Sequence, residues 1–369
     1  MIHRSYHNFH ARLREGAARR GIPLRVMFEL TYRCNFRCGH CYVPEGFKRR
    51  PELSTGEVFS LLDQLRDAGC LYLGFTGGEP LLREDIFDIM WHAKRRGFQL
   101  ILYTNGSLID ARAAREFARL NPNKIDITLP AMSRTAFEKI AGVRGAREKV
   151  FSAVKNLHRK GVKLGFKTCL LKENEIEIDD VRAFASSLGA LHRLDDTLSP
   201  RLDGSMEPYK YRGSLSLDGN VSEPGCHREE PAGRRGDPLE TVVSTGLPRR
   251  FAPRNDISHR KRPAKLFRCG AGERQAAITP DGKLKMCVLI DYPRYDILGK
   301  RFRRGWMRLR KLTRDAERSK GCGCSRCRLE PYCKRCPAMG WLHAKDFSAC
   351  DPASRERALK RMRRYENGN

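Results

Sequence analysis

The sequence predicts an α/β fold in which a parallel sheet curls into a partial barrel. In the first half of the chain, short apolar runs alternate with amphipathic stretches of about ten residues or more. Strands that alternate with helices in this way favour repeated β-α-β units with right-handed crossovers. Five or six such units make a partial (β/α)6 barrel of the TIM type, and the reactive groups of such barrels gather at the carboxyl ends of the strands.

Each element is predicted from its own residues. The first strand, 25–30, is mostly apolar, and the first helix after it begins at a capping box formed by Ser54 and Glu57 and ends at Gly69. The later elements follow from the period of their apolar residues. The further strands are 71–75, 98–103, 125–129 and 162–171, and the further helices are 84–95, 111–120, 147–160 and 179–188.

Three cysteines follow the first predicted strand at a spacing that favours an iron-sulfur cluster. Cys34, Cys38 and Cys41 form a C-x3-C-x2-C pattern. A cubane cluster normally takes four cysteine ligands, so a loop that supplies three leaves one iron open to another ligand. The alternatives are a zinc loop or three unconnected thiols.

A glycine turn follows the second predicted strand. Gly77, Gly78, Glu79 and Pro80 come directly after Thr76. Two glycines let the backbone approach a ligand closely, and Glu79 offers a carboxylate to an ammonium group.

These two motifs, one β-α unit apart, resemble the signature of the radical S-adenosylmethionine (radical SAM) superfamily. The resemblance implies that the open iron chelates the amino and carboxylate groups of S-adenosylmethionine (SAM). It also implies that Glu79 and the turn contact the methionine amino group. One electron from the cluster would then cleave SAM to a 5′-deoxyadenosyl radical that abstracts hydrogen from a substrate.

The resemblance implies further contacts with SAM. Thr104 and Asn105 belong to a Tyr-Thr-Asn-Gly segment expected near the nucleoside, and His40 is expected against the adenine. Thr128 is placed near the ribose or the methionine carboxylate, and Lys167 could pair with that carboxylate. For Thr128 and Lys167, an ordinary strand residue and a solvated lysine are the alternatives.

Seven later cysteines resemble the SPASM extension of radical SAM enzymes, which holds two auxiliary 4Fe-4S clusters. The resemblance assigns Cys324, Cys327, Cys333 and Cys350 to one cluster, and Cys269, Cys287 and Cys336 to the other. Two residues separate Cys333 from Cys336, where the pattern usually has three. The second cluster lacks a fourth ligand, for which Cys226 and Cys322 are candidates, and four of the seven cysteines would also suit zinc.

The expected organisation has five parts. They are a basic segment 1–23, a radical SAM barrel 24–225, a basic Pro- and Gly-rich linker 226–265, a SPASM domain 266–352 and a basic tail 353–369. The formal net charge is +29, from 72 Lys and Arg against 43 Asp and Glu. No apolar run is long enough to span a membrane and no secretory signal is present, so a cytoplasmic enzyme is expected.

SPASM enzymes mostly modify peptides or proteins made on the ribosome. The resemblance therefore implies an enzyme that takes hydrogen from such a substrate to form a crosslink, a thioether or an oxidised residue. The expected partners include a reductant such as flavodoxin or ferredoxin. Many relatives begin with a leader-binding domain of roughly 80 residues, but only about 24 residues precede the first strand here. Leader recognition would therefore need a separate leader-binding protein, or the substrate would be a larger protein or a leaderless peptide.

Three other functions are weighed against peptide modification. Formylglycine formation of the sulfatase-maturing type is disfavoured, because those enzymes carry an aspartate where this chain has Val288. RNA modification is suggested by the charge, but nucleic acid is not expected as a partner, because the C-terminal basic run offers only Tyr365 and no appended RNA-binding fold is apparent. The third alternative is a zinc-binding interaction protein without catalytic activity.

Overall fold

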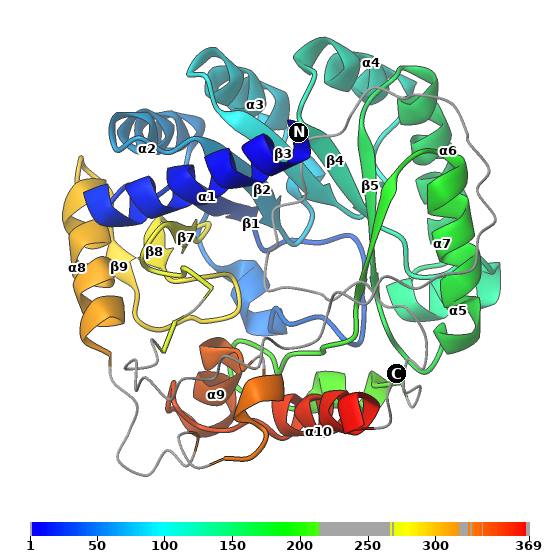
Figure 1. The fold of residues 1–369 in the computed structure, drawn as a ribbon. Coiled ribbons are helices and arrows are strands. Elements are labelled where there is room, and N and C mark those ends of the chain that lie inside the picture. The colour runs from blue at the N-terminus through cyan, green and yellow to red at the C-terminus, as the bar shows by residue number, and fades with distance from the viewer. Residues whose placement is uncertain are drawn as a thin grey trace.

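The computed structural model describes residues 2–213, 266–267, 269–316, 324, 327–333 and 335–366. Their strands form one nine-stranded sheet in the order β6-β5-β4-β3-β2-β1-β7-β8-β9 (Figure 1). The strands are β1 (Arg25–Thr31), β2 (Tyr72–Gly77), β3 (Gln99–Thr104), β4 (Lys124–Thr128), β5 (Leu164–Cys169), β6 (Leu191–Asp195), β7 (Gln275–Ile278), β8 (Lys283–Lys285) and β9 (Tyr295–Asp296).

Helices connect and cover the strands (Figure 1). They are α1 (Ile2–Arg20), α2 (Thr55–Asp67), α3 (Ile86–Arg95), α4 (Ala111–Leu120), α5 (Arg134–Ala141), α6 (Ala146–Arg159), α7 (Ile178–Ser187), α8 (Phe302–Asp315), α9 (Pro337–Ala344) and α10 (Pro352–Glu366). Within the described residues, no helix combines the length and the apolar character that crossing a membrane requires.

The predicted parallel α/β barrel is confirmed. Strands β1 to β6 lie in sequence order and pair in parallel, each with its chain neighbour. The capping box also forms: Ser54 accepts a hydrogen bond from the Glu57 backbone N–H, and the Glu57 carboxylate accepts one from the Ser54 N–H. The first strand therefore leads into a fixed loop, because the helix after it begins at a defined residue.

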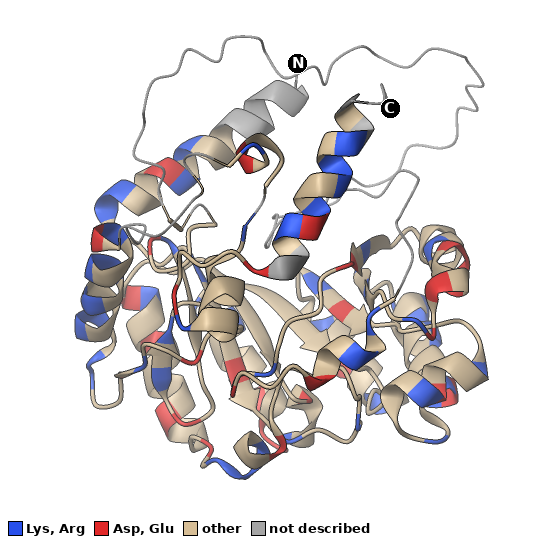
Figure 2. Ribbon diagram, turned by 90° about the horizontal axis from the view of Figure 1, so that it is seen from below, with Lys and Arg blue, Asp and Glu red and all other residues tan. Residues whose placement is uncertain are grey.

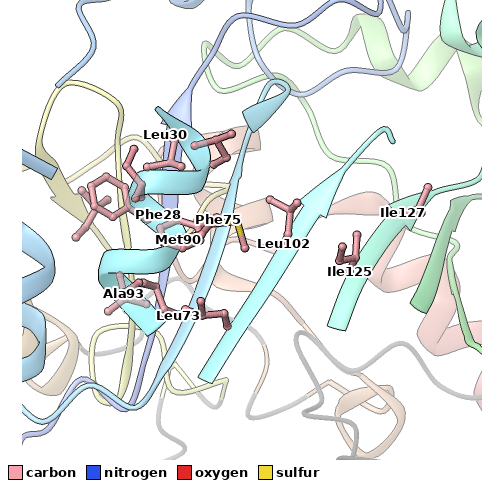
Figure 3. Close-up of a cluster of buried hydrophobic side chains, with 14 of the residues drawn as sticks. Phe28, Leu30, Leu73, Phe75, Met90, Ala93, Leu102, Ile125 and Ile127 are labelled. Carbon is pink, nitrogen blue, oxygen red and sulfur yellow. The ribbon is translucent and has the colours of Figure 1, made fainter. Parts of the chain in front are cut away.

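The core lies between the outer face of the sheet and the helices. Alternate residues of the strands, including Phe28 and Phe75, are buried in one cluster with residues of α2 and α3. Met90 and Ala93 of α3 face the sheet (Figure 3). Because successive strand side chains point to opposite faces, the intervening residues face the barrel interior. Glu29, Lys167 and Asp195 are on that inner side.

The cysteine-rich region extends the sheet of the barrel. Strand β7 pairs in parallel with β1, with Val26 opposite Ala276, and β8 and β9 continue as antiparallel strands. Helix α8 covers this hairpin, and the Trp306 indole N–H donates to the Gly21 carbonyl at 2.6 Å. The two cysteine regions therefore share one framework.

The terminal basic segments are largely helical. The sequence prediction left 1–23 and 353–369 without helices, whereas α1 and α10 occupy most of them. Figure 2 shows Lys and Arg along α10, the helix nearest the C terminus. The predicted linker 226–265 lies outside the described residues.

Candidate functional site

The three-cysteine loop lies at the carboxyl end of β1, an interior strand of the sheet between β2 and β7. Two backbone hydrogen bonds hold the middle and the end of the cysteine pattern: the Arg37 N–H donates to the Ala141 carbonyl at 2.9 Å, and the Cys41 N–H donates to the Cys38 carbonyl at 3.1 Å. Each of the three thiols is partly buried. The loop therefore presents thiols from a braced backbone at the edge where barrel chemistry gathers.

The three thiols are close enough to raise one another's pKa. Burial, with smaller contributions from the nearby Glu79 and Cys41, raises the pKa of Cys34 to about 11. Burial, followed by Cys41 and Cys34, raises the pKa of Cys38 above its usual value. Metal binding must displace these protons, so assembly of a cluster here is expected to release them.

The donor chemistry fits an iron-sulfur cluster, which cysteine thiolates hold. Among the residues that the structure describes, no group of three or more His, Cys, Asp or Glu is arranged to hold a single metal ion. Cys34, Cys38 and Cys41 would hold the cluster, and the cluster would supply the electron for SAM cleavage.

The Gly-Gly-Glu-Pro turn is built directly onto this loop. The Gly78 N–H donates to the Thr31 carbonyl at 2.7 Å, and the Glu79 N–H donates to the Arg33 carbonyl at 2.8 Å. A Cβ on Gly78 would lie 2.2 Å from the Arg33 oxygen, so only glycine permits this approach. The turn and the cysteine loop are thus one structural unit.

The Glu79 carboxylate is fully buried and accepts hydrogen bonds from its own chain. Its oxygens accept from the Thr104 hydroxyl at 2.7 Å, the Asn105 N–H at 2.7 Å and the Leu81 N–H at 3.1 Å. Burial raises the pKa of Glu79 to about 7, although these hydrogen bonds act to lower it. In this structure the carboxylate joins the turn to the Tyr-Thr-Asn-Gly segment, and Pro80 opens the short helix that follows.

Replacing Glu79 by glutamine is expected to destabilise the fold by about 1–3 kcal/mol, because the amide turns a donor toward a group that itself donates. The pH dependence should also change. The carboxyl keeps its proton in the folded state up to a pKa of about 7 but loses it near 4.5 when unfolded. Wild-type stability should therefore fall as pH rises from about 4.5 to 7, by up to about 3 kcal/mol for this group alone.

Denaturant unfolding of wild type and Glu79→Gln across that pH range measures the effect. The difference between the two proteins cancels the titration of the other groups, including His192, whose pKa burial lowers to about 4. A difference that does not change with pH would contradict the expected titration of Glu79.

Asn105 is tied to the cysteine loop by its side chain. Its amide donates to Asn35 Oδ1 at 2.8 Å, and its carbonyl oxygen accepts from the Ser107 hydroxyl at 2.7 Å. The Asn35 amide in turn donates to Ser107 at 2.8 Å. Sequence reasoning missed Asn35 and Ser107, although Asn35 directly follows Cys34 and Ser107 closely follows the Tyr-Thr-Asn-Gly segment.

The structure brings the other predicted SAM contacts to the β4–β6 side of the barrel interior. Thr128 is the register partner of Lys167. Burial, with a smaller contribution from nearby Lys167, lowers the pKa of His40 to about 4. Lys167 pairs with Asp195 at 3.3 Å, with side chains 34% and 29% exposed, so a carboxylate ligand would have to compete with Asp195. Sequence reasoning missed Asp195, because β6 is short and mostly polar.

Among the described residues, six of the later cysteines form two groups whose members act on one another's pKa: Cys269, Cys287 and Cys336, and Cys327, Cys333 and Cys350. Burial, together with neighbouring Cys336 and Cys269, raises the pKa of Cys287 to about 12. Burial raises the pKa of Cys350, and Cys333 and Cys327 add to the shift. Cys324 is described, whereas Cys226 and Cys322 lie outside the described residues. The resemblance assigned the cysteines of each group to the same cluster.

The fold and the site define a class of protein: a parallel α/β partial barrel that carries a three-thiol loop at the carboxyl end of its first strand. Residues 28–185 match the model of the radical SAM superfamily, so this part of the chain is a radical SAM domain. A radical SAM domain implies a 4Fe-4S cluster and SAM.

Two curated relatives are similar to about half of this chain. Fe-coproporphyrin III synthase of Methanosarcina barkeri is 30% identical over 53% of this chain and 47% of its own length. PqqA peptide cyclase of Gluconobacter oxydans is 28% identical over 46% of this chain and 47% of its own length. The match therefore spans about half of each relative.

Solved structures show that the fold extends beyond the matched domain. SuiB of Streptococcus suis bound to SAM has a TM-score of 0.65 and 16% identity over 90% of this chain and 77% of its own. SuiB bound to its precursor peptide SuiA has a TM-score of 0.63 and 16% identity over 94% and 79%. Most of the described chain therefore has the architecture of SuiB.

Proposed function

We propose that this chain reductively cleaves SAM and uses the resulting 5′-deoxyadenosyl radical to take hydrogen from a ribosomally made peptide or protein. The observation that carries the proposal is the hydrogen-bonded unit formed by the three-cysteine loop and the Gly-Gly-Glu-Pro turn. Its thiols suit a cluster with an open iron, and its turn brings backbone groups beside that cluster.

A peptide substrate is supported by the relatives and by the later cysteines. One relative is named PqqA peptide cyclase, and SuiB has been crystallised with a precursor peptide. Cys269, Cys287 and Cys336, together with the second cysteine group, supply ligands for the two auxiliary clusters in this proposal. The product would be a crosslink, a thioether or an oxidised residue, formed with a flavodoxin- or ferredoxin-type reductant and a separate leader-binding protein.

Formylglycine formation has less support. Val288 stands where the sulfatase-maturing enzymes carry an aspartate, and its carbonyl accepts a hydrogen bond from Lys285 at 3.3 Å. The nearby Asp291 is paired with Arg50 at 3.2 Å and with Arg294 at 3.5 Å. The Asp291 carboxylate would have to leave both arginines to reach a substrate, so Asp291 is a poor substitute.

A porphyrin is the second candidate substrate, because the relative with 30% identity is named Fe-coproporphyrin III synthase. The barrel interior carries basic residues that could bind carboxylates. Lys124 pairs with Asp126 at 3.2 Å, and Lys167 pairs with Asp195. Both lysines would have to exchange these partners for a porphyrin carboxylate.

Anaerobic reconstitution tests the proposal. The full chain with iron, sulfide, dithionite and SAM is expected to bind about twelve irons and to release 5′-deoxyadenosine. Candidate peptides and iron-coproporphyrin are then compared by mass spectrometry, and a mass shift of the peptide supports the first substrate class. A fully loaded protein that makes no 5′-deoxyadenosine would contradict the proposal, as would zinc without iron-sulfur absorbance.

A further inference from the structure

A fully buried ion pair joins the barrel to the cysteine-rich region. The Lys285 ammonium on β8 lies 2.7 Å from the Glu29 carboxylate on β1, and both side chains are 0% exposed. Removing either partner would leave an uncompensated charge in the interior, which is strongly unfavourable. An intact buried pair, by contrast, is often no more stabilising than apolar residues of the same size.

The pair spans the strand that separates β1 from β8. Ala277 of β7 is opposite Lys285 on one side and opposite Met27 on the other. Because Ala277 is small and fully buried, the lysine side chain can cross over β7 and reach the inward-facing Glu29. The contact therefore depends on the β1-β7-β8 order of the sheet.

Glu29 also holds both ends of the three-cysteine loop. The Tyr32 hydroxyl donates to Glu29 Oε2 at 3.1 Å, and the Tyr42 hydroxyl donates to Glu29 Oε1 at 3.4 Å. Tyr32 lies two residues before Cys34, and Tyr42 directly follows Cys41. One carboxylate thus connects the entry and the exit of the loop.

Lys285 makes the matching contact on the other side. Its ammonium donates to the Val288 carbonyl at 3.3 Å, and Val288 directly follows Cys287. The ammonium is also 3.4 Å from the Tyr32 hydroxyl. Each charge of the pair therefore contacts residues that flank cysteines.

We propose that the buried Glu29–Lys285 pair is a positioning device that fixes the three-cysteine loop relative to the Cys287 loop. This inference rests on the proposed function only insofar as the two loops hold clusters. The pair orients the two loops, because Glu29 and Lys285 make hydrogen bonds to residues that flank the cysteines of both loops. In a holoenzyme, the pair would set the separation of the two clusters.

The test uses the full chain and four variants. Glu29→Met/Lys285→Met removes both charges and leaves no unpaired ion. Glu29→Gln keeps an acceptor for the tyrosines, but it removes the ion pair and leaves the Lys285 ammonium uncompensated. Lys283→Met is the matched control: Lys283 lies on the same strand and pairs with Asp296 at 2.9 Å, but the two side chains are 30% and 49% exposed. Leu102→Ala, a core truncation on β3, controls for loss of stability alone.

Hydrogen-deuterium exchange of the protein as purified is the first measurement. In the double variant, exchange is expected to rise about tenfold or more both in 32–43 and in 286–290, and by less than about twofold in Lys283→Met. Glu29→Gln should loosen 286–290 more than 32–43. Leu102→Ala should raise exchange in other parts of the chain as much as in 32–43 and 286–290. Unchanged protection, or a response confined to one loop in the double variant, overturns the proposal.

The second measurement is the magnetic interaction between clusters in reconstituted, reduced protein. The power saturation of the cluster signals is expected to change in the double variant and to stay at the wild-type value in Lys283→Met. A wild-type value in the double variant contradicts the positioning role. Hydrogen-deuterium exchange can be measured without bound clusters. A failure to assemble clusters would therefore count against the proposed function, while the effect of the ion pair on the two loops could still be measured.

Discussion

Cys38→Ala is expected to abolish the formation of 5′-deoxyadenosine and to remove about four of about twelve irons per chain, because two thiolates cannot retain a cubane cluster. Cys38 lies in the centre of the loop, and its thiol faces the Ala141 carbonyl at 3.8 Å. Iron and sulfide analysis after reconstitution, together with chromatography of the SAM products, measures both effects. The same loss is expected for Cys34→Ala and Cys41→Ala.

Cys70→Ala is the matched control for this series. Cys70 is also buried, but its thiol donates to the Tyr72 carbonyl at 3.4 Å within the core, away from the cysteine loop. We expect it to keep its full iron content and activity, with a stability loss of about 1 kcal/mol. If Cys38→Ala kept all its iron, or if Cys70→Ala lost a cluster, the assignment of the loop would be wrong.

Fold prediction succeeded where the signal is local. The periodicity of apolar residues and the capping box at Ser54 predicted the units from β1 to β5, because an element that packs on one face repeats its apolar residues at a fixed interval. Helices α1 and α10 were not predicted, because their sequences carry many arginines and show only a weak period of apolar residues. Helix α5 has 8 residues, too few for a clear period.

The candidate site could be predicted only in part for the same reason. The cysteine spacing and the Gly-Gly-Glu-Pro turn are contiguous in sequence, so they are visible without a structure. The Glu29–Lys285 pair joins residues that are far apart in sequence and depends on β7 lying between two strands. The Lys167–Asp195 pair depends on the register of β5 and β6, in which Cys169 is opposite Asp195. Contacts of this kind follow from topology, which local patterns do not specify.

Charge is informative only after pairing is considered. The net charge of +29 suggests acidic partners, yet the basic residues of the barrel interior are paired. Exposed arginines on α8 and α10 account for part of the excess instead. A buried lysine such as Lys285 contributes to the composition but presents no charge to a partner. A substrate inferred from total charge would therefore misjudge the interior of the barrel.

Gly77→Ala is expected to lower the free energy of unfolding by about 2–5 kcal/mol and to weaken SAM binding in the reconstituted protein. Gly77 has a φ of 146°, and a Cβ there would lie 2.0 Å from the Thr31 carbonyl oxygen. That oxygen accepts the hydrogen bond from Gly78, so any shift that relieves the clash separates the turn from the cysteine loop. Denaturant unfolding and equilibrium dialysis of SAM measure the two effects.

Gly97→Ala separates the two causes of the stability loss expected in Gly77→Ala, which are the positive φ and the clash with Thr31. Gly97 also has a positive φ, 82°, but a Cβ there would meet nothing within 4 Å. It should therefore show only the conformational cost of about 1–2 kcal/mol, with SAM binding unchanged. The additional loss in Gly77→Ala then measures the contact between the turn and β1. Equal losses in the two variants would mean that the close approach at Thr31 contributes nothing, and that the turn and the cysteine loop are not held together as one unit.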